Sequence, residues 1–189
     1  MTVRADMEER IRELRSLTNA GTADYTLAGV TYWSDAHLQD ILDGNQTKIR
    51  HAEMQAQESY DSGGSVIYTE YLTYARNWEL SPVIQDVEGK TVAGTVYSFD
   101  AINGIVNFAA DTTGATRYIT GKVYDMSGAA AQVWRRKAAY YAAAYDISTD
   151  NHSLKRSQLV QQCTMMAEQF EAQSGVKTIY TMRSDDVTG

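Results

Sequence analysis

The sequence lacks several features that whole classes of function require. It contains 1 cysteine in 189 residues, which excludes an intramolecular disulfide and a cluster of thiolate metal ligands. It has no run of about 18 uncharged apolar residues, so no membrane-spanning helix is expected. Its first residues, MTVRADMEERIRELR, lack the apolar core of a signal peptide. We therefore expect a soluble protein that assembles in the cytosol.

Basic residues are also scarce. Lysine and arginine total 17 against 24 acidic residues, which gives a formal net charge of -7. This sign of charge disfavours general attraction to nucleic-acid phosphates and to anionic membrane surfaces. The 3 histidines, His37, His51 and His152, lack the i,i+4 spacing of a metal-binding helix. No metal site and no cofactor site are predicted.

What the chain does contain is enough apolar material for a core. It is 43% hydrophobic and has the length of a single domain, which we place at 1–189. Apolar residues recur at helical spacing in four segments. The predicted helices span about 2–18, 35–43, 128–145 and 154–173.

Local signals add detail to these helices. Ser34 and Ser153 are predicted N-caps, because a serine hydroxyl can accept a hydrogen bond from an unpaired backbone N–H. Asp6 with Arg10, and Glu8 with Arg12, are predicted to form i,i+4 pairs on a solvated face of the first helix.

The middle of the chain, about 48–124, alternates with the period of a strand. Residues 66–74, 91–99, 105–109 and 117–124 are predicted strands, and Asn103-Gly104 is a predicted type I′ hairpin turn. Residues 47–60 fit a helix or one face of a strand, and the strong turn signal at 61–64 favours the strand. The predicted fold class is α+β: mainly an α-helical bundle with an antiparallel β insertion and an extended C-terminal arm, 176–189.

Residues that could carry chemistry have structural interpretations. Cys163 lies on the apolar stripe of the last predicted helix and is expected to be a buried small hydrophobe. Gly89-Lys90-Thr91 ends like a phosphate-binding loop, but Ile84 occupies the position of the required first glycine, so a hairpin turn is favoured. The basic run Arg135-Arg136-Lys137 favours a helix face or ion pairs over a DNA groove. We predict no catalytic residue and no enzymatic activity.

Tyrosine is abundant, with 13 residues. Most of them fall in the predicted sheet and in the helix after it. Protein interfaces are rich in such side chains, and ordinary strand propensity accounts for them equally well. Both interpretations stay open.

Several phrases of the sequence together resemble a known family. They are Thr26–Asp35 with Leu38 and Leu42, then Gly104–Phe108, Gly121–Asp125, Gly128–Ala131, and Asp146–Ser148 followed by Ser157–Val160 and the helix to Phe170. In these phrases and in their order the chain resembles the head-tail adaptor proteins of tailed bacteriophages, also called head completion or neck proteins. The resemblance covers nearly the whole chain.

The resemblance implies a structural virion protein. Such adaptors form a ring of identical subunits, usually dodecameric, beneath the portal protein, and they link the capsid vertex to a stopper or another tail-side neck protein. The particle would be assembled in the host cytoplasm. An acidic subunit suits the channel through which DNA leaves the capsid, because the DNA passes without specific binding.

The resemblance also suggests a use for the C-terminal arm. The strand-like segment Lys177, Thr178, Ile179, Tyr180, Thr181, Met182 and Arg183 is interpreted as a portal-docking arm that adds a strand or orders on contact. Two alternatives remain: another neck or tail protein such as a stopper or tail terminator, and a non-viral cytosolic binding module.

Overall fold

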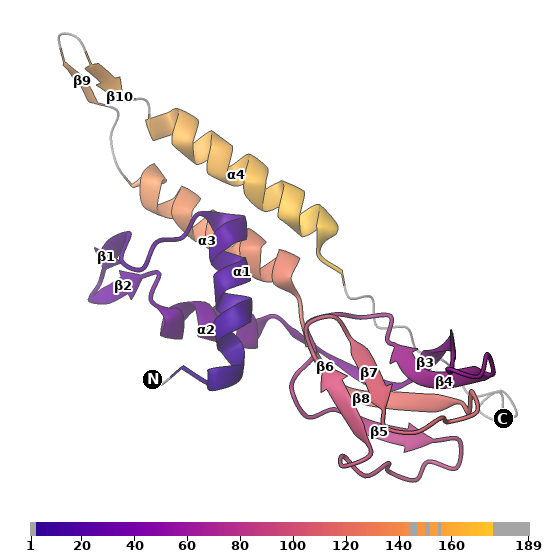
Figure 1. The fold of residues 1–189 in the computed structure, drawn as a ribbon. Coiled ribbons are helices and arrows are strands. Elements are labelled where there is room, and N and C mark those ends of the chain that lie inside the picture. The colour runs from indigo at the N-terminus through magenta and orange to yellow at the C-terminus, as the bar shows by residue number, and fades with distance from the viewer. Residues whose placement is uncertain (1–2, 144–146, 150–151, 155, 176–189) are drawn as a thin grey trace, which may run out of the picture.

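The computed structural model describes residues 3–143, 147–149, 152–154 and 156–175. Its four α-helices follow a short 3-10 turn at Ala5–Met7 (Figure 1). They are α1 (Glu8–Thr18), α2 (Asp35–Gly44), α3 (Met126–Ala142) and α4 (Arg156–Gln173). Helices α3 and α4 lie side by side as a long hairpin, and α1 and α2 pack on α3.

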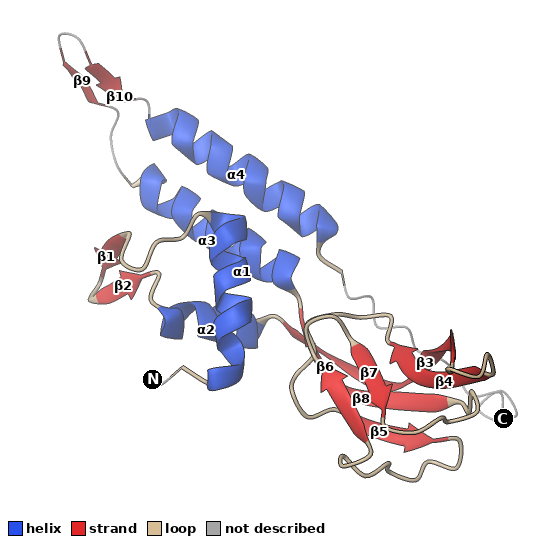
Figure 2. Ribbon diagram, viewed as in Figure 1, coloured by secondary structure: helices blue, strands red, loops and turns tan. Residues whose placement is uncertain are grey.

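The strands form one large sheet and two small hairpins (Figure 2). The hairpins are β1 (Tyr25–Leu27) with β2 (Val30–Tyr32), and β9 (Ile147–Thr149) with β10 (His152–Leu154). The sheet is antiparallel and has six strands in the order β5-β8-β3-β4-β7-β6. Their bounds are β3 (Gln46–Tyr60), β4 (Val66–Leu72), β5 (Val83–Asp86), β6 (Tyr97–Asp100), β7 (Ile105–Phe108) and β8 (Arg117–Tyr124).

The expected mainly helical bundle is wrong, although the α+β content and the antiparallel pairing are observed. The six-stranded sheet lies between α2 and α3 in the chain, where the β insertion was predicted, but strands make up about 31% of the residues and helices about 36%, so the molecule is not mainly a helical bundle (Figure 2). The sheet has an apolar core of its own, built around Tyr71, Trp78 and Ile119, which are all fully buried. The helices enclose a second core around Leu14, Trp33 and Leu38. The helical spacing of apolar residues predicted the helices. It gave no indication that the inward-facing residues of the strands form a separate core.

The helix signals in the sequence are largely observed. Met7, Ile11 and Leu14, which lie at helical spacing in the first predicted helix, are buried. The Ser34 hydroxyl accepts a hydrogen bond from the His37 N–H at 3.3 Å, as expected for an N-cap. Ser153 is not a cap, because it lies in β10 and α4 begins at Arg156. The cap of α3 was not predicted: the Asp125 carboxylate accepts from the Gly128 N–H at 2.8 Å.

Residues 46–60 form a single strand, which resolves the ambiguity over 47–60. The first part of β3 pairs with β8 and its last part pairs with β4, so both halves of the sheet share this strand. A bulge between Ile49 and Ala52 places His51 at a φ of 47°. The backbone N–H and C=O groups of β3 pair with those of β8 and β4. A helix at 46–60 would use these groups within itself and leave β4 and β8 without a partner between them.

Two β predictions are wrong in detail. Of the predicted strand 91–99, only the end from Tyr97 is in a strand, because 93–96 turn back before β6. The β6–β7 loop holds the four residues 101–104 between the paired Asp100 and Ile105. It is therefore not the two-residue type I′ turn expected at Asn103-Gly104, and Gly104 alone of that pair has a positive φ, 71°.

Candidate interaction surfaces

Reactive side chains do not converge in the part of the chain that the structure describes. No group of three or more His, Cys, Asp or Glu residues there could hold a metal ion. His37 stacks on Trp33, and His51 stacks on Tyr118 in the sheet, so the two imidazoles belong to different halves of the molecule. Among the described helices, none is long and apolar enough to cross a membrane.

Cys163 is buried between α3 and α4, as the sequence predicted. Burial raises the pKa of its thiol, which keeps the sulfur protonated and poorly nucleophilic at neutral pH. A pocket of about 420 Å³ opens beside it, with the Lys137 ammonium in its wall.

Lys137 has a structural role in that pocket. Its Nζ donates to the carbonyls of Thr18 and Asn19 at 2.8 and 2.9 Å, and so satisfies the C-terminal end of α1. Burial lowers the pKa of this ammonium, and Asp24 at 3.7 Å partly offsets that effect.

The basic run 135–137 is divided among three partners, and the predicted ion pairs are observed for Arg135 and Lys137. Arg135 pairs with Glu171 of α4, Arg136 contacts the ring of His37, and Lys137 caps α1. Gly89-Lys90-Thr91 is likewise a turn: the Asp86 carboxylate accepts from the Glu88 and Lys90 N–H groups at 3.0 and 2.9 Å.

The molecule instead presents apolar side chains on two hairpin tips at opposite sides of the view in Figure 1. At the first tip, Leu27 and Val30 are cross-strand partners of β1 and β2, and they are 54% and 46% exposed. The base of this hairpin is rigid because Tyr25 stacks between Tyr32 and Tyr140 of α3.

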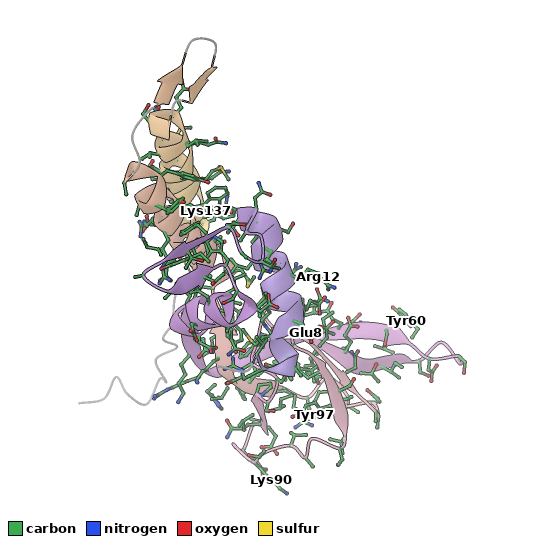
Figure 3. The ribbon with its side chains drawn as sticks, turned by 90° about the vertical axis from the view of Figure 1, so that its left-hand side faces the viewer. Glu8, Arg12, Tyr60, Lys90, Tyr97 and Lys137 are labelled. Atoms are coloured by element: carbon green, nitrogen blue, oxygen red, sulfur yellow. The ribbon has the colours of Figure 1, made fainter. Side chains whose placement is uncertain are left out.

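The second tip ends the ribbon of β3 and β4. Tyr60 and Val66 are its last cross-strand pair, and they are 69% and 44% exposed. Figure 3 shows Tyr60 on the part of this ribbon that extends beyond the body of the sheet. The Asp61 carboxylate accepts from the N–H groups of Gly63 and Ser65, both at 2.8 Å, so the turn is held by its own side chain.

A cleft of about 440 Å³ separates the start of α1 from the sheet. Its apolar floor is Leu80, Phe99 and Ile102. Four carboxylates line it: Asp6, Glu8, Glu9 and Asp100. Hydrogen bonds from the Asn103 side chain and from nearby backbone N–H groups hold the pKa of Asp100 below its ordinary value, so its charge persists at neutral pH.

The wall of this cleft contains Arg10, which joins the two halves of the molecule. Arg10 is 1% exposed and donates to the carbonyls of Asp6 and Trp78. Its guanidinium also lies over the ring of Tyr124, with Cζ 5.0 Å from the ring centroid. The predicted Asp6–Arg10 surface pair is therefore wrong, because the Asp6 carboxylate faces Arg4 at 3.7 Å instead.

The other predicted surface pair is wrong in its partner. Arg12 pairs with Glu9 at 3.4 Å, three residues away, rather than with Glu8. Arg10 lies beside the apolar stripe of α1, three residues after Met7 and four before Leu14. An arginine at the edge of such a stripe ordinarily extends its guanidinium into solvent, so the sequence did not predict its burial.

The tyrosines divide between both interpretations that the sequence left open. Tyr71 and Tyr124 are buried core residues, whereas Tyr60 and Tyr74 are more than half exposed. The predicted portal-docking arm, Lys177–Arg183, lies outside the described residues. No protein-family model and no curated protein sequence matches this chain.

Proposed function

We propose that this chain is the subunit of a head-tail adaptor ring in a tailed bacteriophage, and that it links the portal to the next neck or tail protein. The sequence phrases given above suggest this role. The observation that carries it furthest is the pair of apolar tips at opposite sides of the subunit.

A ring needs two different surfaces on each subunit, because its contacts are head to tail. The tip of β1 and β2 is aliphatic, and the tip of β3 and β4 is aromatic with a polar end at the Tyr60 hydroxyl. Aromatic residues with one polar end are enriched in protein interfaces. Each tip is held by its own contacts, which lowers the entropy lost when it binds.

A second candidate function is favoured by the sheet. Stoppers and tail terminators are richer in strands than adaptors, and the six-stranded sheet makes this chain less helical than expected. The two roles differ in the partner that the ring binds. An adaptor binds the portal directly, whereas a stopper or terminator binds a neck or tail protein.

The deciding measurement is the mass of the purified protein, alone and mixed with a portal ring, by native mass spectrometry. An adaptor is expected to bind with the stoichiometry of a ring. A chain that lacks 176–189 should keep its circular dichroism spectrum and lose portal binding. A full-length chain that remains a monomer beside the portal would contradict the adaptor role, and a truncated chain that still binds would contradict the docking arm.

A further inference from the structure

The cleft between α1 and the sheet has no occupant from the described residues, although its composition specifies one. The carboxylates of Asp6, Glu8, Glu9 and Asp100 surround an apolar floor. Leu80 in that floor is 55% exposed. Arg10 in the cleft wall is directed to backbone carbonyls. Arg12 is paired with Glu9, and Arg4 is paired with Asp6. Glu8 and Asp100 are therefore the two carboxylates of the cleft that no described cation pairs.

A ligand for this cleft must therefore combine positive charge with apolar side chains. The chain carries such a segment beyond its last described residue. Lys177 and Arg183 are the two cations of 176–189, and Ile179, Tyr180 and Met182 lie between them. The two cations match the acidic rim of the cleft, and the apolar residues between them match its apolar floor.

The described part of the chain ends beside the start of α3. The Ser174 hydroxyl donates to the Asp125 carboxylate at 2.5 Å, which fixes the chain beside the start of α3. The residue before Asp125 is Tyr124, whose ring lies against Arg10 in the cleft wall. Eight residues of extended chain span up to about 28 Å, which is the reach of 176–183 from the last described residue.

We propose that the cleft binds residues 177–183 of the same chain before assembly. The cations lie against the carboxylates of Glu8 and Asp100, and the apolar residues cover Leu80 and Phe99. This inference goes beyond the proposed function, because it concerns the free subunit and holds whatever partner the arm later meets. If that partner is the portal, the cleft and the portal compete for one segment.

Trypsin tests the proposal on the full-length protein, because it cleaves after Lys177 and Arg183. The rate of cleavage at these two bonds, followed by mass spectrometry, reports how often the arm is out of the cleft. The double variant Glu8→Gln with Asp100→Asn is expected to speed both cleavages about fivefold, since two surface charge contacts together contribute about 1 kcal/mol. Salt should accelerate the wild type in the same direction.

Two controls keep the test specific. Glu13→Gln removes a charge from the same helix outside the cleft, and it should leave both rates unchanged. Leu80→Ser removes the apolar floor and should speed cleavage, whereas Val87→Ser, at a 73% exposed site away from the cleft, should not. Equal rates in all variants would overturn the proposal, and so would protection that increases with protein concentration. The portal is absent from these measurements, so their failure is separate from failure of the adaptor role.

Discussion

At the scale of single residues, the contact between helices and sheet depends on a buried charge. Arg10 donates to the carbonyls of Asp6 and Trp78 and lies against the ring of Tyr124, and burial lowers the pKa of its guanidinium. Among the hydrogen bonds given for the described residues, the Trp78 carbonyl accepts only from Arg10, so the arginine satisfies a buried carbonyl that an apolar side chain would leave unpaired.

Arg10→Met is therefore expected to lower the free energy of unfolding by about 2 kcal/mol or more, because it leaves a buried carbonyl without a donor. Arg12→Met, at the exposed neighbour one half-turn away, should change it by less than about 0.5 kcal/mol. Urea denaturation of both variants measures the difference. Equal stabilities would show that the Arg10 contacts contribute nothing net.

A second prediction at this scale concerns Tyr25. Burial, followed by the neighbouring tyrosines, raises the pKa of its phenol to about 12, whereas the unfolded chain has the ordinary value near 10. In the window from pH 10 to 12 the unfolded state loses this proton first, so stability falls as the pH rises. Tyr25→Phe keeps the stacked ring and should flatten that decline. Urea denaturation at pH 9 and pH 11 tests it, and an unchanged slope would contradict the assignment.

At the scale of elements, the loop between β6 and β7 depends on a glycine. A Cβ at Gly104 would lie 2.3 Å from the Ala75 carbonyl oxygen and from the Thr73 hydroxyl, and its φ is 71°. The Gly104 carbonyl also accepts from the Thr73 N–H at 2.9 Å. The loop therefore joins the end of β4 to the β6–β7 hairpin through a backbone approach that only glycine allows.

We expect Gly104→Ala to destabilise the protein by roughly 2 kcal/mol, from the combined strain and clash. The matched control is Gly44→Ala at the end of α2, where a Cβ meets nothing within 4 Å. That change should be neutral or stabilising by up to about 1 kcal/mol, because alanine has the higher helix propensity. Thermal unfolding of the pair decides the matter, and similar losses in both would refute the steric argument.

At the scale of the whole molecule, the two hairpin tips make a prediction about assembly. Leu27→Ser with Val30→Ser, or Tyr60→Ser with Val66→Ser, should leave the circular dichroism spectrum and thermal stability unchanged, because these side chains are largely exposed. Each pair should weaken the ring that the proposed function requires, as seen by native mass spectrometry. Val87→Ser is the exposed control. Rings that form normally in both double variants would exclude the tips as contact sites.

Much of this molecule could be predicted from sequence, and the remainder has identifiable physical causes. The Ser34 cap, the buried Cys163 and the turn at 89–91 are decided by neighbours within a few residues, and all three were predicted correctly. The burial of Arg10 and the second core were missed, because they depend on contacts between segments far apart in the chain. The candidate cleft was missed for the same reason. It lies between α1 and β6, which are separated in the sequence by α2 and by strands β3 to β5.

The long strand β3 gives the molecule a mechanical path. It begins directly after α2 and runs without a break in the chain to Tyr60 at the exposed tip, a length of about 50 Å at the usual rise of a strand. A force that pulls the tip along the strand loads the hydrogen bonds to β4 and β8 in shear. Many of these hydrogen bonds then resist the force together. One strand thus joins the end of α2 to the exposed tip, and the bulges at 49–52 and 57–59 are the positions at which that strand bends.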